Sequence, residues 1–277
     1  MSRKMLVVGA AGGVGLEVTK QLLAAGHVVT ATVLNDAEEK TLRAAAAGVH
    51  KVVRLDLSSS ESVRDVLRGA VSALDAVAVC AAMGPVAPLE LMPIALVRKT
   101  LEVNTVSHVA IYQACMPLLR ASKGRIVFIS SFSGKVALPF VGAYSGSKFA
   151  LEGFGDVMRR EAAPFGVHIS LIEPGGINTP MVQGQSADAS RDRAALTDEM
   201  KVLYGPLYDT YLKVFQHASG GLTQAQVAQV VVEAATVDRP AARYVVGDDA
   251  KFMCQQVAAM PDAQADETLA GFLKSLG

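Results

Sequence analysis

The amino-acid sequence predicts an α/β protein: a Rossmann-type, doubly wound parallel sheet of about seven strands, folded as a single domain. Three observations support this fold class. Short apolar runs alternate with helical patterns over most of the 277 residues. Within the run Asp75–Cys80, every residue after the first is apolar, as expected of a parallel strand covered on both faces. A glycine-rich turn joins the first apolar run to the first helical pattern.

The composition argues against several classes of function. Lys and Arg number 26, as do Asp and Glu, so the formal net charge is zero and no basic surface for nucleic acid is expected. The opening apolar run is too brief for a signal sequence, and no membrane span is visible. Cys80, Cys115 and Cys254 form no C-x-x-C pair, which fits reduced thiols in a cytoplasmic protein. The five histidines are scattered, so we expect no metal site.

The first predicted strand, Met5–Gly9, runs into the turn G-A-A-G-G-V-G and then a helix. Free N–H groups at a helix N-terminus suit a pyrophosphate, and glycines let the backbone approach it. A tight turn without a ligand would use similar residues, but strand, turn and helix together favour a dinucleotide site. The candidate cofactor contacts here are Gly9, Ala11, Gly13, Val14 and Gly15.

The second predicted strand is His27–Val33, and the adenine ribose of a cofactor would be bound at its end. Leu34 is the candidate contact there, and Asn35 follows it. Neither an acid for a ribose 2′-hydroxyl nor an arginine for a 2′-phosphate is present at this point, so NAD and NADP both stay open. Because an uncompensated phosphate would be costly, the residues favour NAD.

The third strand is predicted at Val49–Leu55 and leads into Asp56 and Leu57, which are both candidate cofactor contacts. Asp56 could accept a hydrogen bond from an adenine amino group, or it could simply end the strand. The next helix has its N-cap candidates at residues 58–60.

A helix is predicted from about Val97 to Ala121, after the fourth strand. It holds Asn104 among apolar neighbours. A polar side chain in such a setting needs partners, so Asn104 is either a satisfied core amide or part of the site.

Ser131, Tyr144 and Lys148 form the candidate catalytic group. Ser131 follows the fifth predicted strand, Gly124–Ser130, and the helix Tyr144–Phe165 carries the other two side chains one turn apart on one face. A phenol has a pKa of about 10, and a lysine ammonium nearby should lower it toward the working range. The serine hydroxyl could hold a carbonyl or alcohol oxygen. The set suits proton transfer at a C–O group while another group moves the hydride.

The sixth predicted strand, Val167–Ile172, is followed by a break at Pro174–Gly175. In a doubly wound sheet, ligands bind beyond the carboxyl ends of the strands. The glycine turn, Asp56, Ser131 and the segment Pro174–Thr179 all fall at such ends, so these separate clues converge on one edge.

Residues 181–221 interrupt the alternation of strands and helices. They carry an apolar and aromatic set: Met181, Met200, Leu203, Tyr204, Leu207, Tyr208, Tyr211 and Phe215. An insertion of this length is typical of a substrate lid and would suit an apolar substrate, although the same residues could merely cover the core. A helix at Leu222–Thr236, a last strand at Arg243–Val246 and a helical tail at 248–277 complete the single domain 1–277.

From Met5 to about Gly247 the chain resembles the classical short-chain dehydrogenase/reductase family. The family's T-G-x-x-x-G-x-G motif appears at residues 8–15, and its P-G-x-x-x-T turn appears at residues 174–179. Its active-site tetrad falls on Asn104, Ser131, Tyr144 and Lys148. The stretches L-P-F-V-G-A-Y-S-G-S-K-F-A-L-E-G and P-F-G-V-H-I-S-L-I-E-P-G are most similar to the hydroxysteroid and retinol dehydrogenase branch.

The resemblance implies a role for each residue of the tetrad. Tyr144 would be the general acid/base, Lys148 would lower its pKa and hold the nicotinamide ribose, and Ser131 would orient the substrate oxygen. Asn104 would hold a water molecule that relays protons. The implied contacts on the nicotinamide side are Pro174, Gly175, Ile177 and Thr179. The resemblance also implies a homodimer or homotetramer.

The sequence departs from the family pattern at two places. Val8 stands where the glycine motif has threonine, and Val79-Cys80-Ala81-Ala82 stands where the family has N-N-A-G. We expect the two changes to compensate as an apolar contact, since neither leaves a polar side chain stranded. Ala81 and Ala82 remain candidate cofactor contacts, although the methyl group of Ala82 could weaken binding. Cys80 is either a reactive thiol or a small apolar filler.

Two functions follow from these residues. The first is an NAD(P)-dependent oxidoreductase that interconverts a secondary alcohol and a ketone on an apolar, steroid-, retinoid- or aromatic-like molecule. The complete tetrad favours it. The second is a catalytically weak dinucleotide-binding sensor or scaffold, which the Val79–Ala82 segment favours.

Overall fold

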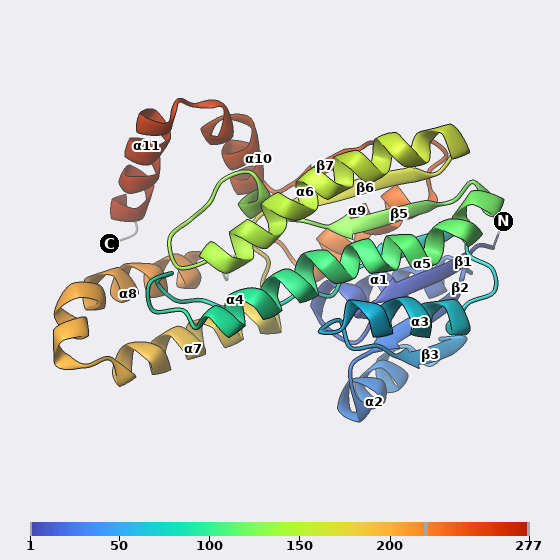
Figure 1. Cartoon of the computed structure of the whole chain (residues 1–277), viewed down its shortest axis with the longest axis horizontal. Helices are drawn as coiled ribbons and strands as arrows, with labels where there is room; N and C mark the ends of the chain where they lie inside the picture. The colour runs from blue at the N-terminus through green and yellow to red at the C-terminus, as the bar shows by residue number, and fades with distance from the viewer. Residues whose placement is uncertain (1, 219–220, 276–277) are drawn as a thin grey trace.

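The computed structural model describes residues 2–218 and 221–275 and contains one sheet of seven strands, all parallel (Figure 1). The strands are β1 (Lys4–Val8), β2 (Val28–Val33), β3 (Lys51–Arg54), β4 (Ala76–Val79), β5 (Arg125–Ile129), β6 (His168–Pro174) and β7 (Arg243–Val246). Their order in the sheet is β3-β2-β1-β4-β5-β6-β7. The predicted fold class is therefore confirmed.

Helices cover both faces of the sheet. The helices packed on it are α1 (Gly13–Ala24), α2 (Asp36–Ala45), α3 (Ser60–Ala70), α5 (Ser107–Ser122), α6 (Gly142–Ala162) and α9 (Gln224–Thr236). Alternate strand residues point to opposite faces. Leu6 and Val8 accordingly pack with α3, α5 and α6, while Met5 and Val7 pack with α1 and α9. Figure 1 shows α5 and α6 crossing in front of the sheet.

The strand order changes direction at β1, which pairs with β2 on one side and β4 on the other. The crossovers from β1 and from β4 leave in opposite directions, and the loops at the carboxyl ends of these strands separate there. A crevice for ligands is expected at this point of a doubly wound sheet. The glycine turn that begins at Gly9 follows β1 directly.

The helix expected to begin near Val97 is instead composite. It begins as α4 (Ile94–Leu101), continues as a π-helical turn (Glu102–Val106) and becomes α5. Asn104 lies inside the π turn. Such turns widen a helix by one residue and occur frequently at functional sites.

Besides α4, four helices of the described residues lie outside the layers that cover the sheet. They are α7 (Pro180–Ala195), α8 (Asp198–Ala218), α10 (Asp248–Gln255) and α11 (Asp262–Ser275). In Figure 1, α7, α8 and α11 lie to the left of the sheet. The expected lid, 181–221, corresponds to α7 and α8 except for residues 219–220, which lie outside the described part. The expected tail, 248–277, corresponds to α10 and α11 except for residues 276–277, which also lie outside it.

Candidate active site

A cavity of about 690 Å³ lies beyond the carboxyl ends of the strands. Of the candidate residues, those that line it are Gly9, Gly13, Val14, Leu34, Asp56, Leu57, Ala81, Ala82, Ser131, Tyr144, Lys148, Pro174, Gly175, Ile177 and Thr179. Ala11, Gly15 and Asn104 are not among the lining residues. The cavity has two ends: a glycine-turn end, formed by the turn and the ends of β1 to β4, and a helical end, formed by residues 138–141 with α7, α8 and α11.

The glycine turn is shaped by close approaches of its backbone. Gly9 has a φ of +78°, and a Cβ placed there would lie 2.6 Å from the Cβ of Ala81. A Cβ on Gly15 would overlap the carbonyl oxygen of Gly9. The backbone N–H of Gly9 donates to the Thr32 hydroxyl at 3.1 Å. Both positions therefore lack space for a side chain, and the backbone conformation of Gly9 favours glycine in addition.

Helix α1 begins at Gly13 without a capping side chain at Gly12 and without an acidic residue in its first turn. Its first N–H groups are therefore free to bind an anion, and the helix dipole favours negative charge there. The residues present fit the pyrophosphate of a dinucleotide.

The departures from the family pattern are structurally compensated. Val8 is buried and Ala81 packs against the same apolar cluster. The backbone N–H groups of Cys80 and Ala81 both donate to the Val8 carbonyl, at 2.9 and 3.2 Å. The expected apolar contact is present, and main-chain bonds hold the segment. Burial raises the pKa of the Cys80 thiol to about 12, which leaves it unreactive at neutral pH.

Glu38 lines the glycine-turn end and was not among the candidates. Its Oε2 accepts from the backbone N–H of Leu34 at 2.7 Å, and its own N–H donates to the Asn35 side chain at 3.0 Å. The signal was present in the sequence, because Asn-x-x-Glu is the spacing of a helix capping box. An acidic group is thus present beside the expected ribose position after all.

Asp56 lies beyond the end of β3, where its Oδ1 accepts from the Ser58 backbone N–H at 2.8 Å. This hydrogen bond is the main cause that lowers the pKa of Asp56. Lys99, which also lines the cavity, acts weakly in the same direction. Asp56 both ends the strand region and presents a carboxylate to the cavity, so both interpretations remain open.

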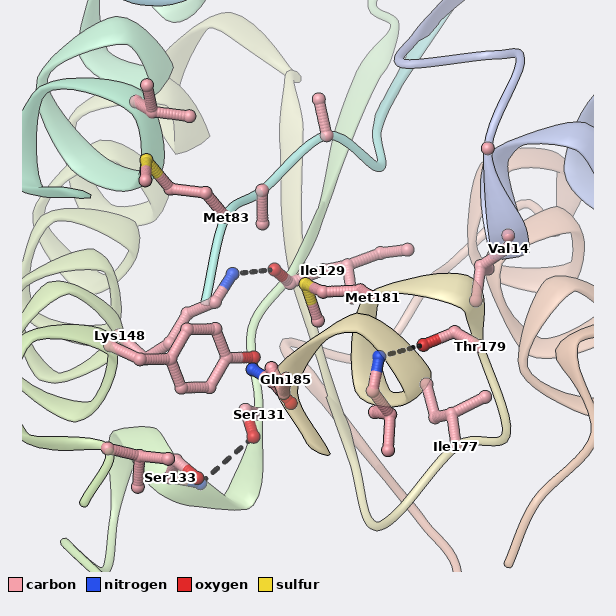
Figure 2. Close-up of a pocket in the computed structure, with 18 of the residues that line it drawn as sticks. Val14, Met83, Ile129, Ser131, Ser133, Lys148, Ile177, Thr179, Met181 and Gln185 are labelled. Atoms are coloured by element: carbon pink, nitrogen blue, oxygen red, sulfur yellow. Dashed lines mark hydrogen bonds between the residues drawn. The ribbon is translucent and has the colours of Figure 1, made fainter. Parts of the chain in front are cut away.

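Ser131 and Tyr144 both line the cavity, and Figure 2 shows Ser131 and Lys148 there. Ser131 begins a short 3₁₀ turn, and its Oγ accepts from the Ser133 N–H at 3.1 Å. The Ser131 hydroxyl lies close enough to the phenol to act on the pKa of Tyr144, which it lowers. Lys148 lies one helical turn after Tyr144, with Nζ 5.5 Å from the centroid of the phenol ring.

The expectation that Lys148 lowers the pKa of Tyr144 is wrong for the protein in this state. Burial raises the pKa of Tyr144, and the Ser131 hydroxyl offsets only part of that effect. The Lys148 ammonium donates to the Ile129 carbonyl at 2.7 Å. Burial also lowers the pKa of Lys148 to about 8, against a raising effect of Glu152. Desolvation is therefore the largest effect on both groups.

Asn104 is buried and its amide is engaged on both sides. Its Oδ1 accepts from the Met83 N–H at 2.8 Å, and its Nδ2 donates to the Met83 carbonyl at 2.7 Å and to the Ser147 hydroxyl at 3.0 Å. Of the two alternatives, it is a satisfied core amide. It ties the π turn to the loop after β4 and to α6, so it supports the position of Lys148. The water-holding role stays a prediction.

A buried imidazole lies near this group. The His108 ring stacks on Phe128 with centroids 5.6 Å apart. Burial, followed by the charge of Lys148, lowers the pKa of His108 to about 3. The ring is therefore neutral in the folded protein at neutral pH.

The segment after β6 closes the cavity from another side. Thr179 caps α7 by accepting from the Val182 N–H at 3.3 Å. A Cβ on Gly13 would lie 3.6 Å from Thr179 Cγ2. The glycine turn and the P-G-x-x-x-T turn thus meet in space, as their shared position at strand ends predicts. The Gly176 N–H donates to Asp249 at 2.7 Å, which fixes the turn to α10.

The helical end is predominantly apolar. Its lining includes Leu138, Phe140, Val141, Met181, Leu207, Tyr211, Val214 and Leu273. Of the expected apolar set, Met181, Leu207 and Tyr211 line the cavity, whereas Tyr208 is buried in a core cluster. The side chain of Phe215 lies outside the described part. Sequence reasoning missed Leu138 and Leu273; the second is distant in sequence and carries no local signal.

Gln185 was also missed. It is buried on α7, lines the cavity and donates to the Gly84 carbonyl at 2.5 Å. Figure 2 shows Gln185 near Ser131.

Within residues 2–218 and 221–275, no group of three or more His, Cys, Asp or Glu side chains could hold a metal ion. In the same residues, no helix has the length and apolar character that a membrane crossing requires.

A family model described as short chain dehydrogenase matches residues 3–190. Among curated proteins, the chain is 29% identical to a 3-amino-tetrahydro-pyrrolizinone reductase of Xenorhabdus hominickii, covering 96% of this chain and 95% of the relative. It is 32% identical to human retinol dehydrogenase 8, covering 87% and 80% respectively. It is 29% identical to human 17-beta-hydroxysteroid dehydrogenase type 6, covering 96% and 87%.

Solved structures show the same fold. A short-chain dehydrogenase from Streptomyces avermitilis aligns with a TM-score of 0.76 at 22% identity, covering 99% of this chain and 96% of the other. One from Burkholderia cenocepacia, in complex with NADP, aligns with a TM-score of 0.73 at 23% identity, covering 96% of both chains.

Proposed function

The chain belongs to the short-chain dehydrogenase/reductase family, among relatives that include retinol and hydroxysteroid dehydrogenases, and on this premise we propose that it interconverts a secondary alcohol and a ketone on an apolar small molecule. One observation carries the proposal: Ser131, Tyr144 and Lys148 line the same cavity as the glycine turn. The bound nicotinamide dinucleotide would supply or accept the hydride.

Tyr144 would give a proton to the substrate oxygen during reduction and take it back during oxidation. The Ser131 hydroxyl, which lines the same cavity as the phenol, would hold the same oxygen. Reduction uses the neutral phenol as an acid, and burial keeps the phenol neutral at neutral pH. The ammonium of Lys148 would stabilise the phenolate that remains after proton transfer.

We propose NAD rather than NADP as the cofactor. The Glu38 carboxylate lies at the glycine-turn end, where a 2′-phosphate would add a second negative group. Lys99 is a cation of that region, but it lies near Asp56 and acts on that carboxylate. We expect Glu38→Gln to strengthen binding of NADPH relative to NADH, as measured by fluorescence titration.

The substrate would be apolar and would occupy the helical end. Leu138, Leu207 and Leu273 contribute aliphatic surface there, and Tyr211 adds an aromatic side chain. A site of this composition binds by burial of apolar surface, with a few polar groups that orient the reacting oxygen. We propose that α7 and α8 act as the lid over this end.

The second candidate function is a dinucleotide-binding sensor or scaffold with weak catalysis. Two observations favour it: Ala82 lines the cavity where the family has glycine, and the pKa of Tyr144 is raised rather than lowered. Both candidates require cofactor binding, so turnover separates them.

We propose a homodimer or homotetramer through the helices that carry Asn104 and Tyr144. Val106 from the π turn and Phe149 and Val157 from α6 are 44 to 47% exposed, and large apolar side chains gathered on helix surfaces mark interfaces.

Cys80, Cys115 and Cys254 are free thiols. This supports the proposal of a cytoplasmic protein.

The experiment is a screen of NADH and NADPH with a panel of apolar ketones, followed by nicotinamide absorbance. We expect oxidation of NADH with at least one ketone, and we expect Tyr144→Phe to reduce turnover by about 10² to 10⁴-fold while it retains NADH binding. Cofactor binding without turnover on any ketone or alcohol would favour the sensor. Dissociation constants far above millimolar for both cofactors would contradict both functions.

A further inference from the structure

Five charged side chains form a cluster behind the catalytic group. Glu152 on α6 and Glu173 on β6 are only 5% and 2% exposed in their side chains. Lys135, after the Ser131 turn, and Arg243, on β7, are each less than a third exposed. Asp156 on α6 completes the cluster. The proposed mechanism uses none of these groups.

The two cations favour Glu152. Lys135 Nζ lies 2.9 Å and Arg243 Nε 3.0 Å from Glu152 Oε2. The corresponding distances to Glu173 Oε1 are 3.8 and 3.1 Å, and the Arg243 N–H is directed to Glu152 in a hydrogen bond. Arg243 Nη1 also lies 3.0 Å from Asp156. Asp156 is also paired with Arg159 and Arg160, at 3.2 and 3.5 Å. Glu152 and Glu173 have no cations besides the two that they share, Lys135 and Arg243, among the ion pairs of the described residues.

Each buried glutamate also has an oxygen that receives no hydrogen bond from the described residues: Glu152 Oε1 and Glu173 Oε1. Both carboxyl groups lie against the same nitrogen, Arg243 Nε, with Glu152 Oε2 at 3.0 Å and Glu173 Oε1 at 3.1 Å, so the two groups are direct neighbours. Two carboxylates cannot both remain ionised at such a separation in a buried site. One proton between them gives a donor to the oxygens that otherwise receive no hydrogen bond.

We propose that Glu152 and Glu173 share a single proton, and that this carboxyl pair positions the three segments that carry Ser131, Lys148 and the Pro174–Gly175 turn. The proton resides on Glu173, because Glu152 has the closer cations. The role as positioning residues rests on the proposed function; the shared proton does not.

Lys135, Glu152 and Glu173 each lie close in sequence to one of the three segments that the pair positions. Lys135 is four residues after Ser131, Glu152 is one helical turn after Lys148, and Glu173 directly precedes Pro174. The Glu152 carboxylate raises the pKa of Lys148, although burial has the larger, opposite effect. An anionic Glu152 therefore helps Lys148 to stay an ammonium. Neither glutamate lines the cavity, so neither is a catalytic residue.

The pair is expected to titrate near neutrality. Burial, followed by the Glu152 charge, raises the pKa of Glu173 to about 7, and Lys135 and Arg243 act against this effect. The other groups that face the pair are Asp156 and Lys148 from α6 and the Cys254 thiol from α10. Burial, with a further contribution from Glu173, raises the pKa of Cys254 to about 12, so the thiol does not titrate in the same range. Above pH 7 the pair carries two charges and its members repel.

The first experiment uses infrared spectroscopy of the full chain, without cofactor or substrate, after labelling with ¹³C-carboxyl glutamate. We expect the carbonyl band of a protonated, buried glutamate below pH 7 and its loss as the pH passes about 7. Glu173→Gln should abolish the band, whereas Asp156→Asn, a change in the same cluster, should keep it. Absence of the band in the unmodified chain would overturn the shared proton. A chain that shows the band but no turnover would refute the proposed function alone.

The second experiment tests positioning. A glutamine at 173 can donate to Glu152 as the protonated acid would, so Glu173→Gln should keep kcat close to that of the unmodified enzyme at pH 6. Its alkaline decline should move from about 7, the value for Glu173, to about 8, the value for Lys148. Glu173→Ala should lower kcat by about tenfold to a hundredfold, because misplaced catalytic groups cost rates of this order, with little change in the KM for NADH.

Two outcomes would overturn the positioning role. One is an equal loss of kcat in Glu173→Gln and Glu173→Ala. The other is an alkaline decline at the same pH in Glu173→Gln and the unmodified chain. Should Glu173→Ala fail to fold, the pH profile of Glu173→Gln still decides.

Discussion

The glycine-turn end and the helical end of the cavity are built in different ways. The first is formed by the ends of adjacent parallel strands, so its side chains are held by the hydrogen-bonded register of the sheet. The second is formed by α7, α8 and α11, which lie beyond the sheet and bring residues as distant as Leu138 and Leu273 together. The lining residues are therefore held in position by backbone hydrogen bonds at the glycine-turn end and by side-chain packing at the helical end. We therefore expect substitutions at the first end to be severe and those at the second to be graded.

Gly15→Ala should have the largest effect. Its Cβ would overlap the Gly9 carbonyl oxygen, whereas a Cβ on Gly12 would meet nothing within 4 Å. We expect Gly15→Ala to lower the melting temperature without cofactor and to abolish NADH binding. Gly12→Ala should leave the melting temperature unchanged and weaken only NADH binding, because its methyl group projects into the lining of the cavity. Equal melting temperatures for both variants would break the comparison.

His108→Leu should make the stability of the protein less dependent on pH, because His108 is buried as a neutral ring. His108 has a pKa of about 3 in the folded protein and about 6.5 when unfolded. Below pH 6.5 the unfolded chain binds a proton that the folded chain does not. The free energy of unfolding therefore falls by about 1.4 kcal/mol for each pH unit by which the solution becomes more acidic. Denaturant unfolding should show this slope between pH 6.5 and about 3, and His108→Leu should reduce it.

The control for this change is His50→Leu, since His50 is exposed. It should leave the slope as it is. A slope that is the same in His108→Leu and the unmodified chain would contradict the buried neutral imidazole.

Leu207→Ser sharpens the comparison at the helical end. It removes aliphatic surface from the cavity lining, so we expect about a tenfold rise in KM for an apolar ketone, as loss of a few methylenes implies. The dissociation constant of NADH should not change. Val202→Ser on the same helix is the matched control, because Val202 is 78% exposed and does not line the cavity. Equal effects on KM would mean that α8 acts through its overall packing.

Ala82→Gly should have the smallest effect. If the Ala82 methyl group limits the approach of the dinucleotide, its removal should tighten NADH binding by about fourfold, since a methyl-sized contact is worth about 0.8 kcal/mol. Ala81→Gly serves as the control: Ala81 also lines the cavity but packs against the core. Weaker binding in Ala82→Gly would show that the methyl group is a favourable contact.

The same contrast explains what could be predicted from the sequence. Residues that follow apolar strands, such as Ser131 and Thr179, were placed at the cavity, because parallel strands deliver their carboxyl ends to one edge. Leu273 and Gln185 could not be found in this way. They reach the cavity through the packing of helices whose orientation no local pattern records.

The directions in which the pKa values of Tyr144 and Lys148 are shifted could not be predicted from the sequence either. The spacing of Tyr144 and Lys148 correctly placed both on one helical face, but it said nothing about burial, which raises one pKa and lowers the other. The π turn around Asn104 was likewise invisible, because it differs from an α-helix by a single residue per turn.

The strand order has a consequence for biosynthesis. Each strand after β1 pairs with a strand that precedes it in the chain: β2 with β1, β3 with β2, β4 with β1, and so on to β7 on β6. When the chain leaves the ribosome amino end first, each new strand therefore finds that the strand on which it pairs has already been made. Domains generally fold in that direction during synthesis. We expect the nascent sheet to grow outward from β1, strand by strand.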